Sequence, residues 1–327
     1  MDIRAMKITD KVVLELFSQH DDFMIEFLGE DSHYYTRYTE NENIESVWVA
    51  YVDNYLAGCI AYRKKAEHVG EVKRLFLRKE YRGKGISKEL LKTMEHHAIT
   101  QGCNVLFLDT RITLEPAVSL YRAYGFDIIF QQGLYIQMEK KLVIETDRLL
   151  LRPFRETDAE DLYEYLHEPT VNCFACMKIR SLEEAKAEAS KRSEDGEFYF
   201  AIVLKETGKV IGEIVAHPET SQPDGTEHMI RDTFSPCWML NTEYQGKGYA
   251  FEAAHAFYDY LFTKKGARRI YAYTEDYNLS SQHLCEKLGM RREGMFTEFV
   301  SFVNNPDGTP LYENTLQYAI LKKEWEE

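Results

Sequence analysis

The sequence predicts two mixed α/β domains joined in tandem. Its 327 residues are too many for one small core and suit two domains of roughly 150 residues each. Short apolar, strand-like runs and helical patterns recur in the same order in both halves. A basic, glycine-rich motif also occurs twice, at 81–87 (YRGKGIS) and at 244–250 (YQGKGYA).

The duplicated motif has a duplicated companion. Gly125 lies 43 positions after Arg82, and Gly289 lies 44 positions after Gln245. Both glycines end a helical pattern, and the two motifs begin 163 positions apart, at 81 and at 244. This offset is far longer than the period of solenoids or propellers, so it indicates a duplicated domain.

The predicted boundary lies between an alternating run at 134–138 and a new strand-like run at 148–152. We therefore predict an N-terminal domain at 1–141 and a C-terminal domain at 142–327.

The elements repeat in order. In the first half the patterns predict strands at 47–51, 57–62, 72–77 and 105–108, and helices at 87–99 and 115–124. In the second half they predict strands at 209–215, 237–240 and 270–274, and helices at 249–262 and 280–288. Asp53 and Asn54 indicate a hairpin between the first two strands.

Composition and charge exclude several classes of protein. Hydrophobic residues make up 44% and charged residues 29%, which is typical of a globular protein. No apolar run approaches the ~20 residues of a membrane span, and the N-terminus lacks an export signal, so we expect a cytoplasmic protein without a membrane partner. Of the net charge of −14, most lies in 142–327, which has 21 Lys and Arg against 33 Asp and Glu. This disfavours nucleic-acid binding and suits a cationic substrate such as an amine, although an acidic surface also serves solubility.

The cysteines do not indicate a metal site. In a reducing compartment the six cysteines are expected to be free thiols. The pair Cys173 and Cys176 has no second pair in the sequence, and His167 alone does not complete a tetrahedral set. We predict no metal.

The glycine-rich motif follows a strand and opens a helix in both halves. Glycines allow a tight turn, and the N–H groups and dipole of a helix N-terminus attract a pyrophosphate. A P-loop needs a glycine where Arg78 and Asn241 stand, and a dinucleotide-binding fingerprint needs one where Lys88 and Phe251 stand. Neither motif is therefore present.

The pattern that fits, Arg/Gln-x-x-Gly-x-Gly/Ala, resembles the acetyl-CoA loop of the GNAT superfamily. The second copy matches fully, and the first departs only at Ser87. The resemblance implies a strongly bent mixed sheet with helices on both faces, and acetyl-CoA entering where two central parallel strands separate. It implies that a backbone N–H of one of these strands polarises the thioester. The implied cofactor-binding residues are Leu75, Leu77, Arg82, Gly83, Lys84, Gly85, Ile86 and Ser87 in the first domain, and Leu240, Gln245, Gly246, Lys247, Gly248, Tyr249, Ala250 and Asn278 in the second.

Two catalytic roles are expected in the first domain. Tyr121, four residues before Gly125, matches the tyrosine that protonates the CoA sulfur in many GNAT enzymes, and a phenol with a pKa near ~10 suits that task. The alternative interpretation is that Tyr121 is a core residue on the buried face of its helix. Glu71 begins the strand before the loop and is the candidate general base, with a solvated strand-end carboxylate as the alternative.

The second domain resembles the RimJ/RimL branch, whose named members acetylate N-termini of ribosomal proteins. The likeness runs from 146–153 to 320–325. By that match Asn278 contacts the CoA arm and Ser281 donates a proton to the thiolate, while Cys285 occupies the position of Tyr121. Ser235 stands where the branch usually carries a glutamate. Glu213 and Asp232 are the candidates to replace that glutamate.

The leading hypothesis is an enzyme that transfers acetyl directly to a primary amine of a small molecule or a protein N-terminus. A second hypothesis makes one half catalytic and the other a degenerate CoA-binding structural or regulatory module. A third is a non-catalytic CoA-sensing protein. The sequence predicts neither the acceptor nor the oligomeric state.

Overall fold

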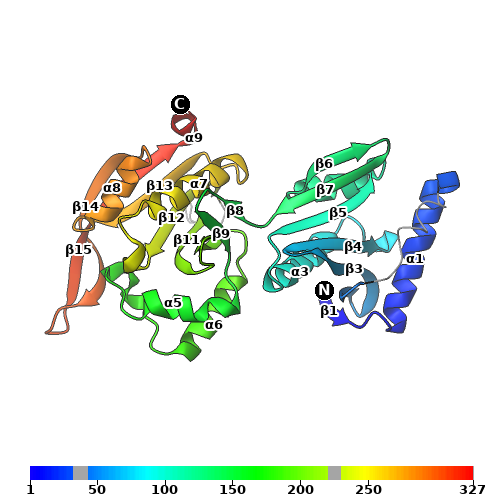
Figure 1. Cartoon of the computed structure of the whole chain (residues 1–327), viewed down its shortest axis with the longest axis horizontal. Coiled ribbons are helices and arrows are strands. Elements are labelled where there is room, and N and C mark those ends of the chain that lie inside the picture. Colours follow the sequence, from blue (N-terminus) through cyan, green and yellow to red (C-terminus); the bar gives the residue numbers. More distant parts are fainter. Residues whose placement is uncertain (32–42, 220–229, 327) are drawn as a thin grey trace. The chain divides into compact units, whose positions relative to one another are not determined.

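The structure, a computed structural model, describes residues 1–31, 43–219 and 230–326. The chain divides into two units, Met1–Leu142 and Val143–Glu327. Each unit contains its own sheet (Figure 1).

In the described part of the first unit a seven-stranded sheet has the order β1-β2-β3-β4-β5-β7-β6. Its strands are β1 (Asp2–Met6), β2 (Ser46–Val52), β3 (Tyr55–Ala66), β4 (Val69–Leu77), β5 (Val105–Arg111), β6 (Asp127–Gln132) and β7 (Tyr135–Lys141). Its helices are α1 (Lys11–Leu28), α3 (Ile86–Thr100) and α4 (Glu115–Ala123). The β4–β5 pair is parallel and its neighbours pair antiparallel, so the sheet is mixed.

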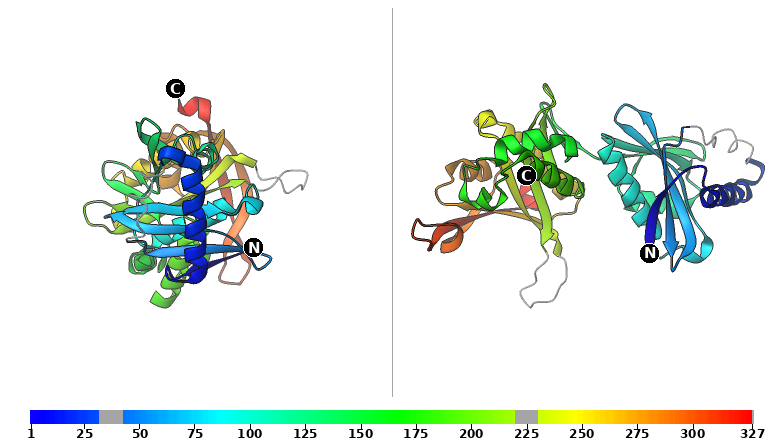
Figure 2. Two further views of the ribbon diagram at one scale, coloured as in Figure 1. Left: turned by 90° about the vertical axis from the view of Figure 1, so that its right-hand side faces the viewer. Right: turned by 90° about the horizontal axis from the view of Figure 1, so that it is seen from below.

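Helices cover both faces of this sheet, as predicted. Leu16 of α1 shares a core with Val49 of β2, on one face. Leu90 of α3 shares another core with the next residue of β2, Ala50, on the opposite face. Successive strand residues point to opposite faces, which explains why the residues of β2 after Ser46 are apolar or aromatic. Figure 2 shows α1 lying across the strands of the first sheet.

The second unit repeats the plan. Among the described residues its eight strands have the order β14-β15-β13-β12-β11-β10-β9-β8. These are β8 (Ile144–Glu145), β9 (Leu149–Pro153), β10 (Tyr199–Leu204), β11 (Val210–Glu219), β12 (Ile230–Leu240), β13 (Arg269–Glu275), β14 (Arg291–Asn304) and β15 (Pro310–Leu321). The helices are α5 (Ala159–Leu166), α6 (Leu182–Ser193), α7 (Tyr249–Thr263), α8 (Leu279–Lys287) and α9 (Lys322–Trp325). One core lies under α7 and α8, and another lies under α5 and α6.

The central parallel strands separate in both units. The β4–β5 ladder ends at Glu71 opposite Phe107, and the β12–β13 ladder ends at Phe234 opposite Ile270. The last residue of β4 and of β12 lies opposite a glycine on the preceding strand, Gly58 or Gly212. A Cβ on either glycine would lie only 2.1 Å or 2.2 Å from a backbone carbonyl oxygen of β4 or β12, so both positions require glycine.

The two units differ at this point. Arg74 in β4 has φ +54°, and the pairing of β4 with β3 shifts register beside it, which marks a bulge. In β12 the pairing with β11 runs without a shift from Phe234 to Leu240.

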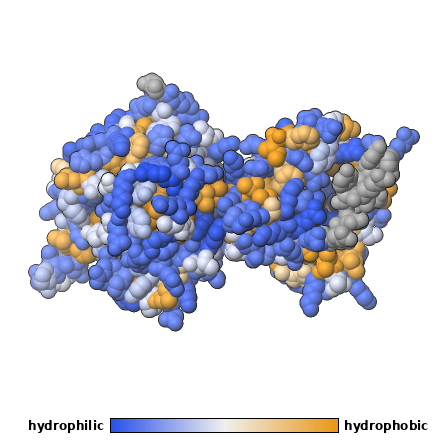
Figure 3. All heavy atoms as spheres, viewed as in Figure 1, coloured by the Kyte–Doolittle hydropathy of each residue, from blue (hydrophilic) through white to orange (hydrophobic). Residues whose placement is uncertain are grey.

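The described helices include none long and apolar enough to cross a membrane. Hydrophilic residues predominate on the faces drawn in Figure 3, with apolar residues in small patches between them.

Candidate active sites

Both glycine-rich loops adopt the same backbone conformation. Gly83 and Gly85 have φ of +74° and +80°, and Gly246 and Gly248 have φ of +73° and +82°. These left-handed values favour glycine. The second glycine of each loop is the N-cap of α3 or of α7. Each loop therefore presents a helix N-terminus with unpaired N–H groups, which is an anion-binding arrangement.

The first residue of each motif attaches the loop to the strand before it. Arg82 donates from Nε to the carbonyl oxygen of Leu77 at 3.0 Å. Gln245 donates from Nε2 to the carbonyl oxygen of Leu240 at 3.2 Å. Arginine and glutamine thus make the same contact, which explains why either residue type serves at this position.

The first unit contains a cleft of about 850 Å³ beside its loop. Of the residues predicted there to bind the cofactor, the cleft is lined by Leu75, Leu77, Arg82, Gly83, Gly85, Ile86 and Ser87. The ammonium of Lys84 instead lies 5.4 Å from the ring centroid of Tyr81. The strand ends and the helix N-terminus therefore share one cavity.

Tyr121 also lines this cleft, although its side chain is buried. Its ring packs edge-on against Phe126, with centroids 5.7 Å apart. Burial, assisted by the nearby Asp109 carboxylate, raises the pKa of Tyr121 above its ordinary value. The phenol therefore keeps its proton throughout the physiological range.

Glu71 lies inside β4 rather than at the mouth of the cleft and is only 2% exposed. Its Oε2 accepts from Arg63 Nε at 2.5 Å, and its Oε1 lies 2.9 Å from Lys73 Nζ. Burial opposes ionisation, but these two cations outweigh it, so the pKa of Glu71 lies below its ordinary value. Lys73 Nζ also contacts Asp109 Oδ1 at 2.8 Å, and Asp109 does line the cleft.

In the second unit Ser281 lies in the first turn of α8 beside β12. Trp238 Nε1 donates to Ser281 Oγ at 3.3 Å, so the serine hydroxyl proton remains free to donate. Asn278 caps α8 by accepting from the Ser281 amide at 3.2 Å. Cys285, at the position of Tyr121, is fully buried in the core.

Comparisons with known proteins match both units to acetyltransferases. Residues 16–126 match the acetyltransferase (GNAT) family, and residues 148–291 match an acetyltransferase (GNAT) domain. YnaD, an uncharacterised N-acetyltransferase of Bacillus subtilis, is 33% identical over 182 residues, which are 56% of this chain and 98% of YnaD. This chain belongs to the GNAT family.

Two solved structures are similar in part. A GNAT-family acetyltransferase from Bacillus anthracis is 29% identical with a TM-score of 0.46, covering 55% of this chain and 99% of its own. A ribosomal-protein-S5-alanine acetyltransferase from Vibrio fischeri is 20% identical with a TM-score of 0.43, covering 57% of this chain and 99% of its own.

Membership makes the chain an N-acetyltransferase with two GNAT domains, as the duplicated motif predicted. The second GNAT domain, however, does not leave Glu213 free. Its carboxylate is 3% exposed and accepts from Tyr165 and from Tyr199, each at 2.8 Å, and it is ion-paired with buried Arg192. Asp232 is held by Arg268. Both candidate substitutes for the missing glutamate are thus occupied by structural contacts.

Sequence reasoning missed a second hollow beside the α7 loop. It measures about 540 Å³ and is lined by Gly248 together with two cationic residues, Arg148 and Lys287. Arg148 donates to the carbonyl oxygen of Lys247 at 3.1 Å, and Glu252 holds its guanidinium. An arginine just before a strand is only a weak sequence signal for a binding site. The position of Arg148 depends on contacts with residues about a hundred positions away.

In the described part of the chain no group of three or more His, Cys, Asp and Glu could hold a metal ion. The six cysteines are free thiols.

Proposed function

We propose that both GNAT domains bind acetyl-CoA and that each transfers its acetyl group directly to a primary amine. One observation carries the proposal. In each unit a loop with two left-handed glycines forms the N-terminus of a helix beside the point where two parallel strands separate. The loop N–H groups would hold the pyrophosphate, and the separated strand edge would offer a backbone N–H to the thioester carbonyl.

The transfer needs no acyl-enzyme. The neutral amine attacks the thioester carbon, the carbon–sulfur bond breaks, and the thiolate takes a proton. In the first unit that proton would come from Tyr121, which lines the cleft. In the second it would come from Ser281, whose oxygen is held by Trp238. The two units thus solve the same step with different acids, since Cys285 is buried where a tyrosine would stand.

For the base of the first unit, Asp109 is the stronger candidate. The expected base, Glu71, lies outside the cleft lining and has both oxygens in ion pairs. Asp109 lines the cleft, its side chain is 27% exposed, and only its Oδ1 contacts Lys73. We infer that Asp109 takes the amine proton, directly or through water, and that Glu71 positions Lys73.

A second proposal, one catalytic half and one regulatory half, is supported by the difference between β4 and β12. The first unit combines the bulge at Arg74 with the 850 Å³ cleft. The second has an unshifted strand in place of the bulge. If one half does not turn over, these features favour the first half as the active one.

Release of free thiol from acetyl-CoA, measured across a panel of primary amines and peptides, tests both proposals. The wild type, Tyr121→Phe, Ser281→Ala and the double variant should be compared. Two working domains predict that each single variant loses activity toward a different set of acceptors. A regulatory second half predicts that Ser281→Ala loses none. Absence of turnover with every acceptor would overturn both proposals.

A further inference from the structure

A second polar cluster, which the transfer steps above do not use, lies on β13 and β15. Glu275 ends β13 and stands directly opposite Thr315 of β15. Glu313 lies two residues before Thr315, so all three side chains point to the same face of the sheet. Glu275 is 6% exposed, Glu313 is 7% exposed and Thr315 is 4% exposed.

These two carboxylates lack cationic partners within the described residues. Glu275 accepts from Asn278 Nδ2 at 3.4 Å. Glu313 accepts from Asn172 Nδ2 at 2.5 Å and from the Tyr277 hydroxyl at 3.2 Å. The Cys173 thiol also bonds Glu275. All of these donors are neutral, so the two carboxylates, when ionised, have no compensating charge among the described residues, which is costly unless a cation joins them.

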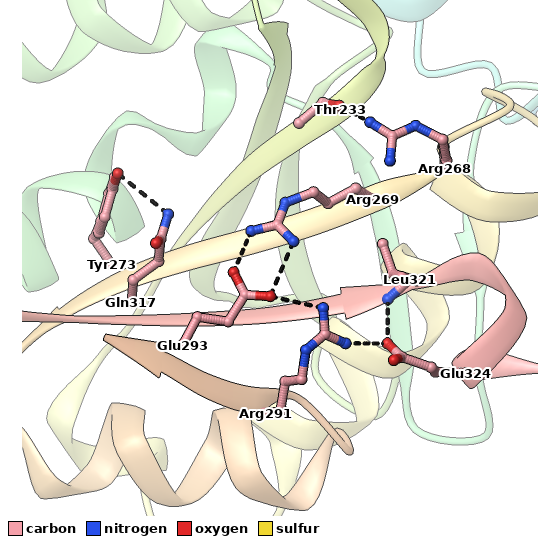
Figure 4. A network of polar contacts seen from close by, with 9 residues as sticks. All are labelled: Thr233, Arg268, Arg269, Tyr273, Arg291, Glu293, Gln317, Leu321 and Glu324. Atoms are coloured by element: carbon pink, nitrogen blue, oxygen red, sulfur yellow. Dashed lines mark hydrogen bonds and ion pairs between the residues drawn. The ribbon is translucent and has the colours of Figure 1, made fainter. Parts of the chain in front are cut away.

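Several other carboxylates of this unit have cationic partners, among them Asp158, Glu213 and Glu293. Figure 4 shows Glu293 held between Arg269 and Arg291, with Arg291 also bonded to Glu324. Glu275 and Glu313 differ from these carboxylates, because no arginine contacts them among the described residues.

Thr315 provides an independent sign of a missing ligand. Its Oγ1 is buried and has no hydrogen-bond partner among the residues that the structure describes. A buried hydroxyl without a partner costs free energy. Thr315 stands opposite Glu275 in the ladder, so its side chain lies beside that of Glu275 and on the same face of the sheet as that of Glu313.

The cluster adjoins the reaction site proposed for the second unit. Asn278 donates to Glu275 and accepts from the amide of Ser281. Burial raises the pKa of the Cys173 thiol, and the carboxylates of Glu275 and, more weakly, Glu313 raise it further, so both carboxylates lie near this thiol. Cys237 of β12 lies beyond the end of the β12–β13 ladder and also raises the pKa of Cys173, so the cluster lies near the separated strands.

We propose that Glu275, Glu313 and Thr315 form the acceptor pocket of the second unit and select a small molecule with two ammonium groups. The proposal rests on acetyl transfer by this unit. One ammonium gives its proton to Glu275, and the resulting amine attacks the thioester carbon as the carbon–sulfur bond breaks. The thiolate takes the Ser281 proton, the serine oxygen takes the second proton that leaves the nitrogen as the amide forms, and Glu275 returns its proton to solvent. The second ammonium stays charged beside Glu313. A single ammonium, such as a peptide N-terminus with neutral side chains, would leave one buried carboxylate uncompensated.

The test compares 1,4-diaminobutane with butylamine. In a Tyr121→Phe background, which isolates the second unit, kcat/KM for the diamine should exceed that for butylamine at least about ten-fold, the value of one charged hydrogen bond. Glu313→Gln should remove that preference, because it lowers kcat/KM for the diamine and takes away the uncompensated charge that disfavours butylamine. Glu298→Gln, at an exposed carboxylate of β14, is the matched control and should change neither.

Calorimetric binding of the diamine distinguishes this proposal from the proposed function. Binding that Glu313→Gln weakens at least about ten-fold supports the pocket even if no amine turns over, in which case only transfer by this unit fails. Equal kcat/KM for the two amines, no diamine binding by a chain that binds acetyl-CoA, or an equal loss of both activities in Glu313→Gln would overturn the pocket. Preference for a neutral peptide N-terminus that is unaffected by Glu313→Gln would also overturn it.

Discussion

The indole nitrogen of Trp238 donates to the hydroxyl oxygen of Ser281 across 3.3 Å. This contact joins the strand beside the cofactor loop to the helix that carries the proposed acid. It occupies the serine oxygen as an acceptor and leaves its proton to donate.

Ser281→Ala should therefore lower kcat of the second unit by about 10²-fold, the lower end of what general acid catalysis contributes. Binding of acetyl-CoA should be unchanged because the loop is intact. Trp238→Phe removes only the positioning contact, so its loss should be smaller. Thiol release in the Tyr121→Phe background measures both, and an unchanged kcat in Ser281→Ala would remove Ser281 from catalysis.

Tyr121→Phe should lower kcat of the first unit by a similar factor of about 10² without changing KM for acetyl-CoA. Phenylalanine preserves the ring contact with Phe126, so stability should hold. Thiol release in a Ser281→Ala background is the measurement. If the Tyr121→Phe protein lost activity only because its melting temperature fell, Tyr121 would be a core residue and not the acid.

Asp109→Asn and Glu71→Gln should separate chemistry from structure. Asp109→Asn should lower kcat of the first unit most at low pH, where the neutral amine is scarce and a base matters most. Glu71→Gln should instead destabilise the first unit by about 3 kcal/mol, because it removes the buried negative charge that Arg63 and Lys73 contact.

The pH dependence of that stability has a definite sign. The folded pKa of Glu71 lies below its ordinary 4.5, so the stabilisation is complete above pH 4.5 and is lost as the pH falls through the lowered folded value. Urea denaturation of wild type and Glu71→Gln between pH 3 and pH 7 measures it. A difference between the two proteins that does not shrink at low pH would contradict the assignment.

Much of the fold could be predicted because its central elements carry local signals. The signals for the glycine turn of each loop, the strand before it and the helix after it all come from neighbouring residues. These elements form where they were expected. Asp53 and Asn54, predicted as a hairpin turn, have positive φ of 51° and 66°. Helices α1, α5 and α6, by contrast, lie outside the duplicated pattern and were not predicted.

The predicted site was least complete where it depends on distant pairing. Glu71 was expected at a strand end, but β4 begins at Val69, which places Glu71 beside Arg63 of β3. The bulge at Arg74 uses a positive φ at a residue type that gives no such signal. Glu275 and Thr315 are forty positions apart, and only the β13–β15 register brings them together.

Glu213→Gln should destabilise the second unit by about 3 kcal/mol, because buried Arg192 would lose its buried counter-charge and keep only the partly exposed Glu188. Glu188→Gln is the matched control. It also contacts Arg192, at 3.0 Å, but its side chain is 32% exposed, so its effect should stay under about 1 kcal/mol. Urea denaturation measures both changes. A stable Glu213→Gln protein with abolished turnover would instead make Glu213 a catalytic base.

The central claim, two cofactor sites in one chain, is tested most directly by calorimetric titration with acetyl-CoA. Gly85→Glu and Gly248→Glu each place a carboxylate where the pyrophosphate should bind, while Gly85→Asn and Gly248→Asn tolerate positive φ without adding charge. We predict two sites per wild-type chain, one in each glutamate variant and two in each asparagine variant. A single wild-type site that only one of the glutamate variants removes would contradict the claim.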